Sequence, residues 1–128
     1  MSDILILETK KDAERKAKQI PDPTGFHILC MVPKIDDTYG DSAIIKADET
    51  MKVESQTTLV LYVAKMGDMA YADKTRFPNG PWCKVGDFII TRAYSGTRVL
   101  IHGTEWRIIN DDTVEAVVDD PRGIRRAG

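Results

Sequence analysis

Hydrophobic residues gather along this chain in short runs of about five, a length typical of β-strands. In the last third, turn residues separate these runs at intervals of roughly 8 to 12 residues, which is typical of a small antiparallel barrel or sandwich. We therefore predict an all-β fold, a small irregular antiparallel β-barrel. The runs place its strands at 26–32, 58–64, 87–92, 98–101, 105–109 and 113–118.

Residues 1–25 have a different pattern and are expected to form an N-terminal extension. Thr9 and Asp12 have the spacing of a capping box, and helix-forming residues follow them, so we predict a short helix over about 10–19. Its faces are mostly charged, and a helix this short is marginal without packing. Residues 21–25 contain two prolines and a glycine, which end the helix in a turn.

Two long polar stretches, 34–57 and 65–83, interrupt the strand pattern. The first is acidic and contains a single apolar run, Ala43-Ile44-Ile45. Connections of this length are uncommon inside a compact domain and are usually functional when they occur. From the pattern alone, the apolar run is equally well a docking motif or a short strand packed onto the sheet.

Composition and charge limit the classes of protein. The length of 128 residues fits one domain, 26–118, followed by a polar tail at 119–128. The net charge of −2 argues against binding nucleic acid by charge alone. The chain has no apolar run long enough to span a membrane, and its first residues lack the basic region of a signal peptide. We therefore expect a cytoplasmic protein without membrane contact.

The residues most often used in catalysis and metal binding are few and scattered. Cys30 and Cys83 each adjoin apolar or aromatic residues, so we expect buried reduced thiols, although the sequence also allows a disulfide. His27 and His102 are not spaced as metal ligands, and His102 is expected in a solvated hairpin turn. The pair Asp111-Asp112 is expected in a solvated turn. We predict no catalytic residues, no metal site and no cofactor.

Four segments resemble one known family, the bacterial co-chaperonins (GroES-like), which are the small partners of the chaperonins. Residues 84–90 resemble the family's "VKVGD-hydrophobic" signature, and residues 94–109 are similar to its run from "G-T/E-x-V-K-I-D-G-E-E-Y" into "L-I-M". Residues 111–118 resemble its "E-x-D-I-L-A-V-V" ending. The strand before Pro33, followed by residues 43–45, looks like the family's first strand and mobile loop. Together the four pieces keep the family's order and spacing.

The resemblance implies a specific function. Members of the family fold as an irregular β-barrel and assemble into a ring, seven-membered in bacteria, that closes the folding chamber of a GroEL-type chaperonin. The chaperonin binds the ATP, and the lid is not an enzyme. The family's docking motif matches Ala43, Ile44 and Ile45 in this chain.

This chain departs from the family in several places. Ser42-Ala43 replaces a Gly-Gly pair, and in the gap-free register Lys46 takes the third hydrophobic position. A register shifted by one residue makes Ala43-Ile44-Ile45 the hydrophobic triplet and fits equally well. The 65–83 connection is longer than the family's, and the N-terminal extension lies outside its pattern. Long divergent members of this kind resemble the co-chaperonins of tailed phages, which act in the host cytoplasm.

Two other classes of function also fit a small β-barrel. Aromatic residues close to arginines suggest a nucleic-acid-binding barrel, whose affinity would fall steeply with salt. A structural protein of a virion would share the oligomer without needing a chaperonin. The residues in question are Trp82, Arg92, Tyr94, Arg98, Trp106 and Arg107.

Overall fold

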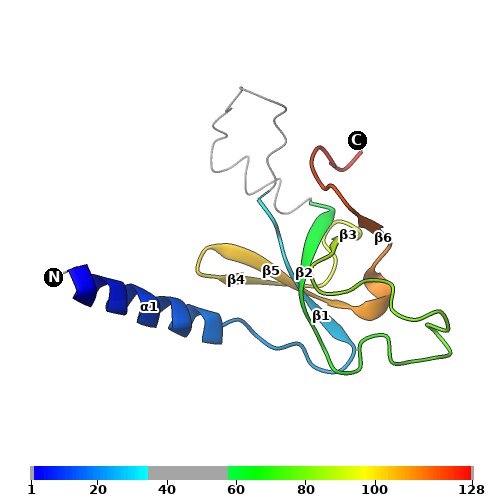
Figure 1. The fold of residues 1–128 in the computed structure, drawn as a ribbon. Helices are drawn as coiled ribbons and strands as arrows, with labels where there is room; N and C mark the ends of the chain where they lie inside the picture. The colour runs from blue at the N-terminus through cyan, green and yellow to red at the C-terminus, as the bar shows by residue number, and fades with distance from the viewer. Residues whose placement is uncertain (1, 35–57, 128) are drawn as a thin grey trace.

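The computed structural model describes residues 2–34 and 58–127 (Figure 1). These residues form one α-helix, six β-strands and one turn of 3-10 helix, so the fold is mostly β, as predicted. In chain order the elements are α1 (Ser2–Lys18), β1 (His27–Met31), β2 (Val60–Met66), β3 (Phe88–Ile90), β4 (Thr97–Ile101), β5 (Thr104–Asn110), η1 (Asp111–Thr113) and β6 (Ala116–Val118).

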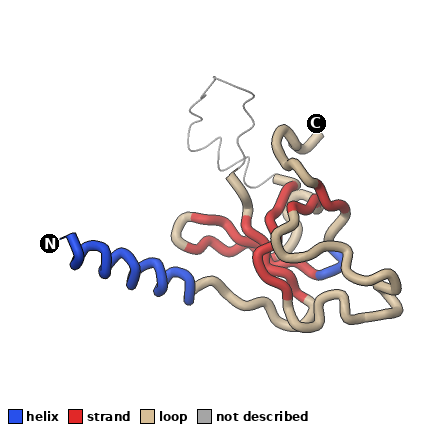
Figure 2. The backbone as a smooth tube through the Cα atoms, viewed as in Figure 1, coloured by secondary structure: helices blue, strands red, loops and turns tan. Residues whose placement is uncertain are grey.

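The six strands belong to a single antiparallel sheet in the order β4-β5-β1-β2-β3-β6. β1 pairs with β5 on one side and with β2 on the other, and its register with β2 shifts between Leu29 and Cys30. Such a bulge increases the local twist of a sheet. The connection at 91–96 takes the chain from β3, on one side of β1, to β4, on the other side. Figure 2 shows the strands gathered in the centre of the molecule, with loops extending from them.

The hydrophobic core lies against one face of the sheet, and alternate residues of the strands point toward it. Ile28 and Cys30 of β1, Leu61 and Val63 of β2, and Ile89 of β3 form part of one buried cluster. The opposite face of the two central strands is also covered, because Leu29 and Val60 are buried as well. Burial on both faces explains why these strands are continuous apolar runs rather than strict alternations.

The connection between β2 and β3, residues 67–87, contributes to this core although it contains no strand. Its Tyr71, Phe77 and Cys83 side chains are buried, and the Tyr71 and Phe77 rings meet edge to face. The backbone N–H of Tyr71 donates to Asp111 Oδ2 at 3.0 Å. This contact ties the connection to η1, so the predicted strand at 113–118 shortens to β6, and Asp111 is buried rather than solvated.

Helix α1 is longer than predicted and begins before Thr9. Thr9 lies inside the helix and not at its N-terminus, because the helix also includes the apolar stretch that precedes the predicted start. Figure 1 shows α1 extending away from the sheet. Ala13 and Ala17, the small apolar residues of its second half, are accordingly exposed.

The cysteine prediction is confirmed, since Cys30 and Cys83 are both free and buried. Burial raises the pKa of the Cys30 thiol to about 12. Among residues 2–34 and 58–127, none of the helices is long and apolar enough to cross a membrane.

Gly96 permits the close passage of the 91–96 connection over β5. Its φ is +79°, and a Cβ atom placed there would lie 2.4 Å from the Ile108 carbonyl oxygen and 2.7 Å from a methyl group of Ile109. We expect Gly96→Ala to lower the free energy of unfolding by about 3 kcal/mol or more, since strain and overlap combine. Urea denaturation measures this change.

Gly103→Ala is the matched control, because Gly103 has nearly the same φ, +78°, but no atom lies within 4 Å of the added Cβ. It should cost only the backbone strain, about 1–2 kcal/mol. If Gly96→Ala and Gly103→Ala lowered the free energy of unfolding equally, the 91–96 connection would not pass as closely over β5 as the structure shows.

Candidate functional site at the roots of the 35–57 segment

The docking residues predicted from the sequence, Ala43, Ile44 and Ile45, lie outside the described residues. The structure nevertheless places the two points where the 35–57 segment joins the sheet. Lys34 follows β1 and Thr58 precedes β2, and these strands are antiparallel neighbours in the centre of the sheet. The segment therefore leaves and returns at the same end of two adjacent strands (Figure 1).

Backbone hydrogen bonds hold both roots of the segment onto the sheet. The Val32 N–H donates to the Glu105 carbonyl oxygen at 2.9 Å, and the Thr91 N–H donates to the Leu59 carbonyl oxygen, also at 2.9 Å. Val32 additionally packs against the hydrophobic core. Each root is thus fixed beyond the end of its strand, one beside β5 and the other at the end of β3.

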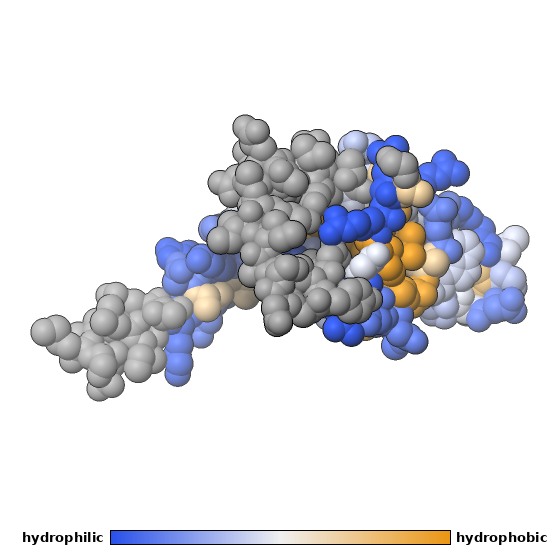
Figure 3. Space-filling model, turned by 90° about the horizontal axis from the view of Figure 1, so that it is seen from above, coloured by the Kyte–Doolittle hydropathy of each residue, from blue (hydrophilic) through white to orange (hydrophobic). Residues whose placement is uncertain are grey.

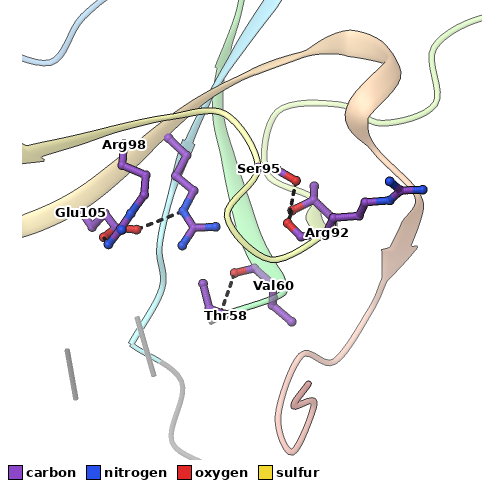
Figure 4. Close-up of polar contacts among 8 residues, drawn as sticks. Thr58, Val60, Arg92, Ser95, Arg98 and Glu105 are labelled. Atoms are coloured by element: carbon purple, nitrogen blue, oxygen red, sulfur yellow. Dashed lines mark hydrogen bonds and ion pairs between the residues drawn. The ribbon is translucent and has the colours of Figure 1, made fainter. Parts of the chain in front are cut away.

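A cluster of two arginines and one glutamate lies beside the first root. Arg98 Nη2 donates to Glu105 Oε1 at 2.6 Å, and Arg107 Nε donates to Glu105 Oε2 at 3.0 Å. Arg98 and Arg107 are opposite each other in the β4–β5 hairpin, which brings both toward the same carboxylate. Figure 4 shows Arg98 beside Glu105. Arg107 is fully buried on the core side of the sheet, opposite Cys30 of β1.

The charges in this cluster stabilise one another. Burial by itself would raise the pKa of Glu105, but the hydrogen bonds from Arg98 and Arg107 outweigh it and lower that pKa below the usual range. The same carboxylate raises the pKa of Arg98. Glu105 therefore stays ionised at neutral pH and compensates the buried charge of Arg107.

The second root is flanked by the turn at Arg92–Ser95. Both the N–H and the hydroxyl of Ser95 donate to the Arg92 carbonyl oxygen, at 3.2 and 2.6 Å (Figure 4). Within this turn Tyr94 has a φ of +65° and is 56% exposed. A non-glycine residue in this region is strained, so the turn holds an aromatic ring in solvent at some cost in stability.

Seen from the end that carries the segment, the surface of the molecule is uneven in polarity. Figure 3 shows a compact hydrophobic patch on this face of the molecule, bordered by hydrophilic residues. This end of the molecule thus has apolar and charged areas side by side.

The structure separates the residues that suggested nucleic-acid binding. Trp106 and Arg107 are buried, whereas Trp82, which packs on the Phe77 ring, and Tyr94 are 47% and 56% exposed. A stacking surface for bases needs exposed aromatic rings along one groove. The burial of Trp106 and Arg107 therefore removes two of the six residues from any such surface.

The histidines and the paired aspartates do not form a site. His102 is exposed at the β4–β5 turn, as predicted, and its Nε2 lies 2.6 Å from Gln19 Oε1. Asp111 faces Tyr71, whereas Asp112 pairs with Arg76. Over the described parts of the chain, no group of His, Cys, Asp and Glu side chains could hold a metal ion.

Sequence reasoning missed the cluster around Glu105, although a signal for it was present. Alternation along β5 puts Glu105, Arg107 and Ile109 on one face, and Ile109 belongs to the core. A charged residue in phase with a core residue indicates a buried ion pair, and the neighbouring strand supplies the second arginine.

Glu105→Gln tests the cluster through its dependence on pH. The substitution removes the carboxylate that accepts hydrogen bonds from Arg98 and from buried Arg107, so we expect a loss of about 3 kcal/mol in the free energy of unfolding at pH 7. Because the folded-state pKa of Glu105 is lowered, its contribution is present above the unfolded-state value near 4.5 and is lost as the pH falls through the folded-state pKa. Denaturation curves should show a smaller difference in the free energy of unfolding between variant and wild type at pH 3 than at pH 7.

The control for this prediction is Glu115→Gln. Glu115 is exposed and lies 3.9 Å from Arg92, so its removal should change stability by less than about 1 kcal/mol. A Glu105 variant that behaves like the Glu115 variant would show that the cluster does not stabilise the fold.

The roots of the segment, the charged cluster and the strained turn thus meet at one end of the sheet. No known family model matches the chain, and no curated protein is significantly similar to it in sequence.

Proposed function

We propose that this chain is a co-chaperonin, a subunit of a ring-shaped lid that docks on a chaperonin and assists ATP-dependent protein folding. Docking is through Ala43, Ile44 and Ile45 in the 35–57 segment. The lid itself is not an enzyme and needs no cofactor, since the partner chaperonin binds the ATP. In this proposal the antiparallel sheet is the irregular barrel of the co-chaperonin family.

One observation carries the proposal: a long polar segment with a single apolar run is inserted between two adjacent, firmly held central strands. A connection between antiparallel neighbours needs only a few residues. The additional length serves no purpose in joining β1 to β2, which is the usual mark of a functional loop. The resemblance of residues 84–90, 94–109 and 111–118 to co-chaperonins supports the same assignment.

The energetics of such a segment suit a lid. Burying Ile44 and Ile45 in a partner groove would contribute roughly 1.5–3 kcal/mol each. Ordering a flexible segment costs about 1–2 kcal/mol per residue fixed, so a single subunit should bind weakly. Several subunits on one ring raise the effective concentration, and avidity can exceed single-site affinity by about 10²- to 10⁴-fold.

The fixed roots matter for this avidity. Linked sites gain affinity only if their geometry permits simultaneous binding. The hydrogen bonds at Val32 and Leu59 set the origin of the segment in each subunit. A ring of such subunits would present its segments at regular positions toward the partner.

Light scattering of the purified protein tests the assembly and the partner together. A seven-membered ring of 14.3 kDa subunits would have a mass of about 100 kDa. After addition of a bacterial chaperonin and ATP, light scattering coupled to size-exclusion chromatography should show the protein in the same fraction as the larger chaperonin particle. A monomer that does not bind the chaperonin would contradict the proposal.

Ile44→Asp tests the docking motif. A charge in the apolar run should abolish binding to the chaperonin, because the carboxylate would be desolvated in the partner's groove. The ring should still form, with an unchanged circular dichroism spectrum. Pull-down with the chaperonin and ATP measures the loss.

Met51→Asp is the control, since Met51 belongs to the same segment but lies outside the apolar run. It should bind as the wild type does. If Ile44→Asp instead unfolds the protein, the residue belongs to the core and the alternative interpretation, a short strand packed onto the sheet, is right.

A further inference from the structure

Within residues 2–34 and 58–127, helix α1 extends as an arm away from the sheet (Figure 1). It has 17 residues, which corresponds to a length of about 25 Å. All the residues from Lys10 to Gln19 are exposed except Asp12, which is partly buried. A helix of this size is marginal in isolation and usually persists by packing on another surface.

The base of the arm is fastened to the body of the molecule. Lys65 Nζ lies 2.8 Å from Asp22 Oδ1 and donates to the Ile20 carbonyl oxygen at 3.5 Å. The Gln19 side chain contacts His102 at the tip of the β4–β5 hairpin. These contacts direct α1 away from the sheet on the side of that hairpin, and Figure 1 shows the 67–87 connection on the opposite side.

The sequence of the arm combines apolar and basic residues. Its first half contains the run Ile4-Leu5-Ile6-Leu7. Its second half, residues 10–18, has five basic residues against the acidic Asp12 and Glu14. A surface that receives this helix should therefore offer apolar contacts and an excess of negative charge.

Such a surface exists on the side opposite the arm. A hollow of about 330 Å³ there is bordered by Phe26 and Met69, which are 49% and 55% exposed. We call it the socket; its other lining residues are Ala72, Asp73, Arg76, Phe77 and Asp111.

Acidic residues outnumber basic ones around the socket. Asp73 and Asp111 line it, Asp68 adjoins Met69 in the chain, and Asp112 pairs with Arg76. The basic residues within 68–77 are Lys74 and Arg76. Four carboxylates against two cations leave an excess of negative charge, which is complementary to the basic arm.

We propose that α1 of one subunit packs into the socket of a second copy of this chain. The fastened base directs α1 away from its own socket, so the occupant comes from a neighbour. An arm on one side and a socket on the other form a heterologous contact, and such contacts generate closed rings when the rotation closes. This inference rests on the ring of the proposed function and names the contact that assembles it.

Three exposed residues allow the contact to be broken without touching the core: Met69 in the socket, and Lys10 and Lys11 in the arm. Met69→Lys removes apolar area from the socket and adds a charge that repels the arm. The double variant Lys10→Glu with Lys11→Glu reverses the charge of the arm. In sedimentation velocity of the full chain over a dilution series, each should raise the concentration for half-assembly about tenfold or more. The effect of the double variant should shrink in 0.5 M salt, where exposed charges are screened.

Val85→Lys is the matched control, because Val85 lies on the same connection as Met69 and is 54% exposed. It should assemble as the wild type does, and all variants should keep the wild-type circular dichroism spectrum. Mixing provides a second measurement. The arm variant, Lys10→Glu with Lys11→Glu, keeps an intact socket, and the socket variant, Met69→Lys, keeps an intact arm. An equimolar mixture of the two should therefore form heterodimers, whereas neither variant should dimerise alone.

The outcomes separate this inference from the proposed function. Wild-type assembly in both variants, with normal docking on the chaperonin, would overturn the arm-and-socket contact alone. Normal rings that lose chaperonin binding in the arm variant would also overturn it, because the arm would then contact the chaperonin. A wild-type chain that stays monomeric and ignores the chaperonin would overturn both.

Discussion

The carboxylate and backbone of Glu105 join three parts of the structure. Its side chain accepts hydrogen bonds from Arg98 of β4 and from Arg107, and its carbonyl oxygen accepts one from Val32. The buried guanidinium of Arg107 needs a negative charge nearby, because an uncompensated buried charge is strongly destabilising. Glu105 thus couples the edge of the sheet, the core and one root of the 35–57 segment at a single residue.

Much of the fold could be predicted from hydrophobic pattern. Each expected strand exists, because apolar runs bounded by glycine and proline leave few alternatives to a strand. The bounds changed where tertiary contacts intervened. Asp111 turns the chain before β6 because it is held by Tyr71, forty residues away, and no local pattern encodes such a contact.

The helix and the site show different limits of sequence reasoning. Thr9 has capping-box spacing, yet the helix continues through it, because a capping motif is only a local preference. The charged cluster depends on the pairing of β4 with β5, which the sequence suggests only through the turn at His102–Gly103. The proposed docking residues, Ala43, Ile44 and Ile45, were identified from resemblance and lie outside the described residues.

Burial of both thiols has a practical consequence for following this protein in solution. Cys30 and Cys83 lie in the core, and burial raises the pKa of each, so neither thiolate is available to an alkylating reagent while the core is closed. The rate at which such a reagent modifies the chain therefore measures how often the sheet opens. The native sequence carries its own probe of local unfolding, one thiol in the central strand and one in the connection that covers it.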